Sequence, residues 1–248
     1  MSKNKIINQP DETAALFDFD RTVIDVNSAL LFAKHEYRNG TISTWQFFTS
    51  IYYGVLYHFD FIDIEKAYSE ALQLYKGRLA NVLEELTRIW FEQEVKKHVQ
   101  PGALKALEWH RQRGDPLVLV TNSTGFMAKV ISETWEFDHW IANNLPVDDE
   151  GRITGELDLP LCYGEGKVVR SKKWAEKNGI NLNKSYFYTD SITDLPLLEA
   201  VGYPRIVNPD PKLRHLAGKR KWPILDWTIY GRRRNFDLEK QLPFTDKL

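Results

Sequence analysis

Short apolar runs alternate along this chain with longer segments of helical periodicity. The runs lie at residues 14–19, 116–121, 185–189 and 204–207 and are rich in aromatic and β-branched residues. Such alternation of strand and helix is typical of a mainly parallel sheet. The pattern therefore predicts an α/β fold with a Rossmann-like, doubly wound core.

Roughly a hundred residues of mostly helical pattern separate the first predicted strand from the second. Connections between a strand and the next helix usually have about 2–6 residues, so this excess predicts an inserted domain. The helices that we propose in it lie at 27–39, 43–58, 64–76 and 79–97. We expect a discontinuous core of residues 1–24 and 99–248 and a cap, an α-helical bundle, at 25–98.

Composition sets limits on the function. The 248 residues include 33 basic and 34 acidic side chains, for a net charge of −1. This balance gives no general attraction for nucleic acid, and we expect no nucleic-acid partner. No stretch reaches the ~20 apolar residues of a membrane-spanning helix, and the first residues lack the apolar core of a signal peptide. We expect a cytoplasmic protein, and the sequence leaves the oligomeric state open.

Two carboxylates and a hydroxyl follow the first predicted strand, in the segment DFDRT at 18–22. Ligands of open α/β sheets bind beyond the carboxyl ends of the strands. Asp18 and Asp20 would therefore project into a site from one side of the strand, with Thr22 in support. This placement indicates phosphoryl transfer on a carboxylate nucleophile.

Three further motifs follow in order, namely LVLVTNST at 117–124, GEGK at 164–167 and YTDSITD at 188–194. Together with DFDRT they resemble the four motifs of the haloacid dehalogenase (HAD) superfamily of phosphohydrolases. The cap type and the form of the last motif resemble the branch that contains phosphoserine phosphatase. The resemblance implies a Mg²⁺-dependent phosphatase that forms an aspartyl-phosphate intermediate.

The resemblance also implies roles for individual residues. Asp18 stands at the position of the nucleophile. Asp20 would protonate the leaving alkoxide and then activate water, because departure of an alkoxide needs a proton. Lys167 would balance negative charge at the phosphoryl group, and Thr121 and Asn122 would hold phosphate oxygens.

A hard cation is expected because two carboxylates would otherwise repel a phosphate dianion. By resemblance, Mg²⁺ would bind the Asp18 side chain, the backbone carbonyl of Asp20 and the side chain of Asp190. Asp194 would orient a metal-bound water or Lys167. The six histidines are scattered without the spacing of a zinc site.

The chain departs from its relatives at two places. Thr189 and Ser191 replace both glycines of the common last motif G-D-G-x-x-D. Phosphoserine phosphatases resembling this chain carry a glutamate for the substrate amine nine residues after the nucleophile, where Asn27 stands here. We therefore rank phosphoserine below an unspecified small phosphomonoester and keep histidinol phosphate as an alternative. Asp25 is a second cap candidate for contact with the substrate.

Two segments raise the alternative of a lipid substrate. Residues 45–62 are apolar or aromatic on almost all sides, which suits the core of the cap, a dimer contact or a lysophospholipid pocket. Basic and aromatic residues alternate from Lys212 to Arg234, including Trp222, Trp227, Tyr230 and Arg232 to Arg234. Such a segment is compatible with a solvated basic face or with peripheral contact to an anionic membrane.

The alternatives from other classes are a non-catalytic phospholigand-binding or membrane-docking module and a phosphotransferase that uses an alcohol acceptor. The intact set of Asp18, Asp20, Lys167 and Asp190 favours an enzyme over a binding module. We therefore expect a phosphoric monoester hydrolase, with a small-molecule phosphomonoester as its binding partner.

Overall fold

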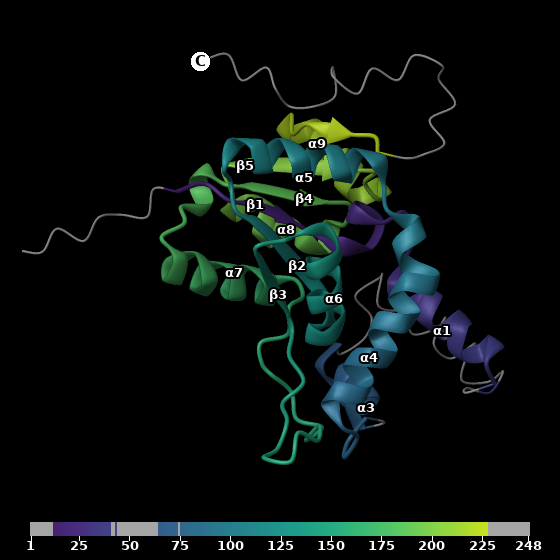
Figure 1. Cartoon of the computed structure of the whole chain (residues 1–248). Coiled ribbons are helices and arrows are strands. Elements are labelled where there is room, and N and C mark those ends of the chain that lie inside the picture. The colour runs from purple at the N-terminus through teal and green to yellow at the C-terminus, as the bar shows by residue number, and fades with distance from the viewer. Residues whose placement is uncertain (1–11, 41–42, 44–63, 74, 228–248) are drawn as a thin grey trace, which may run out of the picture.

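A computed structural model describes residues 12–40, 43, 64–73 and 75–227 (Figure 1). In this part of the chain six strands pair in parallel in the order β3-β2-β1-β4-β5-β6. Their bounds are β1 Ala15–Phe17, β2 Leu117–Thr124, β3 His139–Asn143, β4 Tyr186–Thr189, β5 Tyr203–Val207 and β6 Ile224–Leu225. The order reverses direction between β1 and β4, as in doubly wound folds. The predicted fold class is confirmed.

The predicted strands correspond to β1, β2, β4 and β5, the strands with continuous buried runs. β1 is buried at every residue and ends at Phe17, two residues earlier than predicted. The sequence pattern missed β3 and β6. β3 begins with two exposed residues, and β6 has only two residues, so neither gives a long apolar run.

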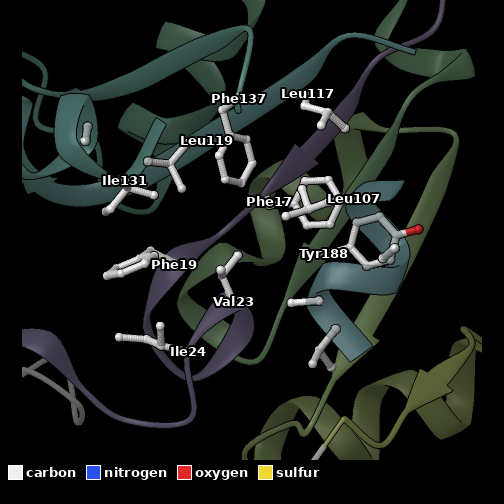
Figure 2. Packing of buried hydrophobic residues seen from close by; sticks show 14 of the residues in the cluster. Phe17, Phe19, Val23, Ile24, Leu107, Leu117, Leu119, Ile131, Phe137 and Tyr188 are labelled. Atoms are coloured by element: carbon white, nitrogen blue, oxygen red, sulfur yellow. The ribbon is translucent and has the colours of Figure 1, made fainter. Parts of the chain in front are cut away.

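Helices cover both faces of the sheet. α5 (Pro101–Arg113) and α6 (Gly125–Trp135) pack on one face. α7 (Glu165–Asn178), α8 (Leu195–Ala200) and α9 (Pro211–Arg220) pack on the other. Figure 2 shows the first of these layers, where the rings of Phe17 and Tyr188 stack with centroids 4.5 Å apart. Burying an apolar side chain of this size stabilises the fold by roughly 1.5–3 kcal/mol.

The helices of the insertion are α1 (Ser28–Arg38), α3 (Ile64–Gln73) and α4 (Ala80–Trp90), which lie to one side of the sheet in Figure 1. The predicted helix at 43–58 falls almost wholly outside the described residues. α4 is shorter than the predicted helix at 79–97, because the chain widens into a π-turn over Phe91–Val95 and then tightens into a 3₁₀ turn over Lys96–His98. This change of winding places Phe91 against Trp135, in the core under the first helical layer.

The two ends of the insertion are joined to each other. Ile24 forms an antiparallel bridge with Val99, and the Asp25 N–H donates to the carbonyl of His98 over 3.0 Å. The buried Gln100 side chain donates to the carbonyls of Arg21, Thr22 and Ile24. These contacts support the proposed boundary between core and cap, which stays a prediction.

One aromatic residue of the C-terminal segment is not available to a membrane. Trp227 is 3% exposed and stacks on Tyr188 with ring centroids 5.4 Å apart, so it belongs neither to a solvated basic face nor to a membrane contact, the two interpretations of its segment. Its ring fills the space beside Gly102, where an added Cβ would lie 2.3 Å from it. Trp222, another aromatic residue of this segment, is partly buried against the core. The remainder of the segment, residues 228–234, and residues 45–62 lie outside the described residues. Within the described ranges, no helix has the length and apolar character needed to cross a membrane.

Candidate functional site

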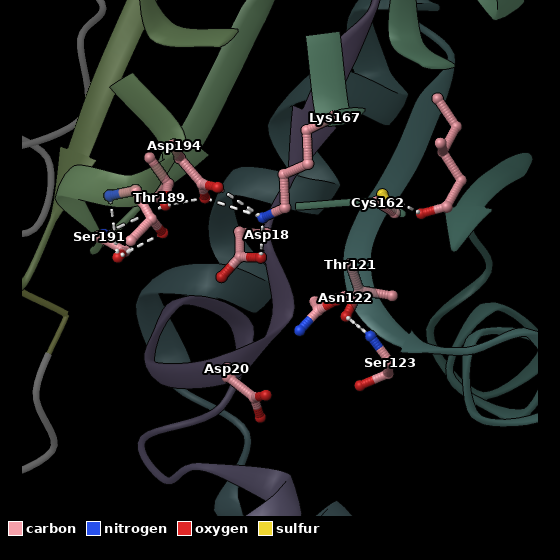
Figure 3. Close-up of polar contacts among 12 residues, drawn as sticks. Asp18, Asp20, Thr121, Asn122, Ser123, Cys162, Lys167, Thr189, Ser191 and Asp194 are labelled. Carbon is pink, nitrogen blue, oxygen red and sulfur yellow. Dashed lines mark hydrogen bonds and ion pairs between the residues drawn. The ribbon is translucent and has the colours of Figure 1, made fainter. Parts of the chain in front are cut away.

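The four sequence motifs meet at the carboxyl end of the sheet, where the strand order reverses (Figure 3). Asp18 follows β1, and its N–H donates to the Tyr188 carbonyl of β4 over 2.9 Å. Asp190 follows β4, and Thr121 lies in β2, the other neighbour of β1. Because parallel strands end at a common edge, residues between 69 and 172 positions apart in the chain become neighbours.

Lys167 is the central cation of this site. It lies near the start of α7, is 3% exposed, and donates from Nζ to Asp18 Oδ1 over 2.7 Å. The same nitrogen lies 2.8 Å from Asp194 Oδ1 and donates to Asp194 Oδ2 over 2.9 Å. The glycines of GEGK make this approach possible, since Gly164 has a φ of +50° and a Cβ on Gly166 would lie 1.8 Å from the Leu161 carbonyl oxygen.

Acids outnumber cations in this buried cluster. Burial raises the pKa of Asp18 to about 7, although Lys167 opposes the rise. Burial, followed by repulsion from Asp18 and Asp194, raises the pKa of Asp190 well above its usual range. Burial by itself would lower the pKa of Lys167, but its two carboxylate partners outweigh that effect and raise it. The site therefore holds a protonated lysine among three acids, and additional positive charge would favour their ionised forms.

Asp20 does not lie on the strand as predicted. The chain turns tightly over Phe19–Val23, with Arg21 at a φ of +56°, and this turn leads toward the insertion. Both Asp20 carboxylate oxygens accept hydrogen bonds from Ser28, from its N–H over 2.7 Å and from its hydroxyl over 3.1 Å. Burial raises the pKa of Asp20, and the bonds from Ser28 oppose the rise. Sequence reasoning missed Ser28, because a serine at the start of a helix is also an ordinary residue for that position.

The predicted phosphate loop is held from the adjacent strand. The Ser123 N–H donates to the Thr121 hydroxyl over 3.1 Å. The buried Asn143 of β3 donates from Nδ2 to the Asn122 carbonyl over 2.7 Å and to Asn122 Oδ1 over 3.0 Å. Thr124 then caps α6 by accepting from the Met127 N–H. Nothing in the sequence distinguished Asn143, because its contact depends on the pairing of β2 with β3.

Two supporting residues have different surroundings. The Thr22 hydroxyl is buried and has no hydrogen-bond partner among the described residues. Asp194 is buried, and its Oδ2 also accepts from the Thr189 hydroxyl over 2.6 Å. The structure thus brings Asp194 onto Lys167, whereas it gives the Thr22 hydroxyl no hydrogen-bond partner among the described residues.

The two cap candidates are engaged within the protein. The Asn27 side chain caps α1 by accepting from the Leu30 N–H over 2.9 Å. Asp25 Oδ1 pairs with His98 Nδ1 over 2.9 Å, across the two ends of the insertion. Both side chains therefore have structural contacts that sequence reasoning did not anticipate.

The acids fit a magnesium ion of the predicted kind. No group of three or more His, Cys, Asp and Glu side chains in the described residues is arranged to hold a metal. The predicted set needs only two side chains, Asp18 and Asp190, with a backbone carbonyl and waters as further ligands. Asp190 is 6% exposed, and the nearby acids Asp18 and Asp194 repel its negative charge. A buried carboxylate in this state is suited to a cation.

Comparisons with known proteins agree with this geometry. Residues 15–199 match the family model of haloacid dehalogenase-like hydrolases. The chain is 33% identical to the "Inhibition of morphological differentiation protein" of Streptomyces azureus, over 87% of this chain and 78% of that protein. It is 26% identical to a histidinol-phosphatase of Neisseria meningitidis, over 86% of this chain and 98% of that one. It also resembles a solved Bordetella pertussis protein of unknown function, with a TM-score of 0.79, 29% identity and coverage of 88% and 99%.

Proposed function

Since the chain belongs to the haloacid dehalogenase-like hydrolase family and is a phosphatase-type hydrolase, we propose that it is a Mg²⁺-dependent phosphomonoesterase that uses Asp18 as its nucleophile. The observation that carries this proposal is the buried Lys167 ammonium held between Asp18 and Asp194. Lys167 engages only Oδ1 of Asp18, which leaves Oδ2 for attack on phosphorus.

The reaction has two steps. The Asp18 carboxylate attacks phosphorus, the bond to the ester oxygen breaks, and Asp20 gives that oxygen its proton. Asp20 then takes a proton from water, whose oxygen attacks the same phosphorus and releases Asp18 and inorganic phosphate. The burial that raises the pKa of Asp20 favours the protonated form needed in the first step. Ser28 holds this carboxylate from the insertion.

Several groups would stabilise the negative charge of the phosphoryl group. Lys167 supplies a fixed ammonium, and the loop at Thr121 and Asn122 supplies a hydroxyl and N–H donors. Mg²⁺ would be held by Asp18, Asp190 and the Asp20 carbonyl, and it would neutralise charge on the phosphoryl oxygens.

For the substrate we propose a small phosphomonoester whose binding does not depend on an acid at position 27. Asn27 uses its side-chain oxygen as a helix cap, and Asp25 pairs with His98, so neither supplies a carboxylate for a substrate amine. This favours compounds other than phosphoserine. Histidinol phosphate stays a candidate because of the similarity to the Neisseria enzyme. A lysophospholipid stays a candidate on the aromatic character of residues 45–62.

The test is phosphate release from a panel of phosphomonoesters, with Mg²⁺ and with a chelator. The panel contains phosphoserine, histidinol phosphate, lysophosphatidate, sugar phosphates and p-nitrophenyl phosphate, and Asp18→Asn is the control. We expect metal-dependent release by the wild type and none by the variant. Borohydride should trap the acyl phosphate at Asp18 by reducing it to an alcohol. Equal release by Asp18→Asn would contradict the proposal.

A further inference from the structure

Thr189, the last residue of β4, has a contact that the common form of its motif cannot make. Its side chain is buried, and its hydroxyl donates to Asp194 Oδ2 over 2.6 Å (Figure 3). The same oxygen atom of Thr189 lies 3.3 Å from the Ser191 N–H, which donates to it. These two hydrogen bonds fix the direction of the hydroxyl group, whose one proton points at the Asp194 carboxylate.

The Asp194 carboxylate passes this constraint on to Lys167. Asp194 Oδ2 receives both the Thr189 hydroxyl and the Lys167 ammonium, and Oδ1 lies 2.8 Å from the same ammonium. Hydrogen bonds to an ionised carboxylate are shorter and stronger than neutral ones, so the Thr189 contact restricts rotation of the carboxylate. The orientation of Asp194 in turn fixes where Nζ of Lys167 lies.

The position of Nζ matters because the ammonium has three N–H donors. One is directed at Asp18 and one at Asp194, which leaves the third for the phosphoryl group. Stabilisation of charge in a transition state depends on donors that are already in place before the reaction. A rotated Asp194 would draw Nζ away from Asp18 and from the phosphoryl oxygens.

We propose that the Thr189 hydroxyl is a positioning group for phosphoryl transfer, acting through Asp194 on Lys167. The inference rests on the proposed phosphatase function. The common motif form G-D-G-x-x-D has a glycine at the position of Thr189 and hence no hydroxyl. The proposed hydrogen bond is therefore specific to the Thr-Asp-Ser form of the motif that this chain carries.

The experiment compares Thr189→Val, which removes the hydroxyl at nearly constant volume, with Thr189→Ser, which keeps it. Thr189→Ala is a second variant without the hydroxyl. Thr134→Val is the matched control, because the Thr134 hydroxyl donates to the Val130 carbonyl within α6, outside the proposed site. Each full-length protein is assayed with Mg²⁺ and p-nitrophenyl phosphate for kcat and KM, and its folding is checked by circular dichroism.

We expect Thr189→Val and Thr189→Ala to lower kcat about 10- to 100-fold, the range for losing a hydrogen bond to a charged group. KM should change little, and Thr189→Ser and Thr134→Val should stay near the wild type. A folded Thr189→Val protein with wild-type kcat would overturn the inference, as would a serine variant no better than valine. Failure of both hydroxyl-free variants to fold would make the role structural and overturn it too. An inactive wild type would instead overturn the proposed function, and this inference with it.

Discussion

Replacing Asp18 with asparagine should stabilise the metal-free protein at neutral pH while abolishing its turnover. Burial raises the pKa of this carboxyl to about 7, with Lys167 opposing and Asp194 adding to the rise. Asparagine has nearly the same shape and carries no charge, so it resembles the protonated form that the folded protein prefers. Catalytic groups commonly reduce stability in this way.

The expected size follows from the pKa. A rise from 3.8 to about 7 corresponds to at most about 4 kcal/mol of destabilisation once the group is fully ionised. The folded state binds the Asp18 proton more tightly than the unfolded state does. The contribution of Asp18 to the stability of the wild type therefore falls as pH rises from about 4 to about 7 and then levels off. The difference from Asp18→Asn should be near zero around pH 4 and largest near pH 8.

The assay is urea denaturation in EDTA at several values between about pH 5 and about pH 8. The control variant is Asp149→Asn. It removes the carboxylate of an exposed residue that lies outside the buried cluster around Lys167. If thermal unfolding is also measured, a gain of about 4 kcal/mol in the free energy of unfolding would raise Tm by roughly 10 °C for a protein of this size. Added Mg²⁺ should stabilise the wild type more than Asp18→Asn, because it neutralises the same charge.

Two results would refute this reasoning. One is an Asp18→Asn protein no more stable than the wild type near pH 8 without metal. The other is a gain in stability that does not change with pH, since a benefit from packing alone would lack the dependence on ionisation.

Three further predictions follow from the site and the core. Asp20→Asn should lower turnover of alkyl phosphates by about 10²–10⁴ and that of p-nitrophenyl phosphate less; equal losses in steady-state rates would contradict the acid role. Asn27→Ala should cost about 0.5–2 kcal/mol through loss of the cap on α1 and leave KM unchanged. Faster hydrogen exchange in α1 would check this, and a raised KM would show contact with the substrate instead. Burial lowers the pKa of His110, so the unfolded chain binds its proton more tightly and the contribution of His110 to stability should fall below about pH 6.5. His110→Gln should flatten that slope in urea midpoints, and an unchanged slope would argue against His110 as its source.

The sequence was sufficient to predict that polar residues after several strands lie at one edge of the sheet. Continuous apolar runs marked β1, β2, β4 and β5, and polar residues at their carboxyl ends had to share one edge of a parallel sheet. Asp18 and Asp190 were assigned to one metal site by resemblance, and the structure places both at that edge. Lys167 was assigned by resemblance. Gly164 and Gly166, which precede it, explain how the loop can bring its side chain close to Asp18.

Contacts made across elements were not predictable. Ser28 meets Asp20 only because the chain turns at Arg21, and Trp227 is buried only because Gly102 leaves space for its ring. Asn143 holds Asn122 because β2 pairs with β3, a strand with no clear signal of its own. These contacts depend on where two backbones lie, which a pattern along one backbone does not specify.

The sequence by itself therefore determined the fold class and the identity of the charged groups, because hydrophobic periodicity and motif order are local properties of the chain. Only the tertiary structure decided how those groups are used. It placed one buried ammonium between Asp18 and Asp194, assigned Asn27 to a helix end, and directed the Thr189 hydroxyl onto Asp194. Hydrogen bonds and ion pairs act over about 3 Å, so their partners are fixed only when packing has brought distant segments together.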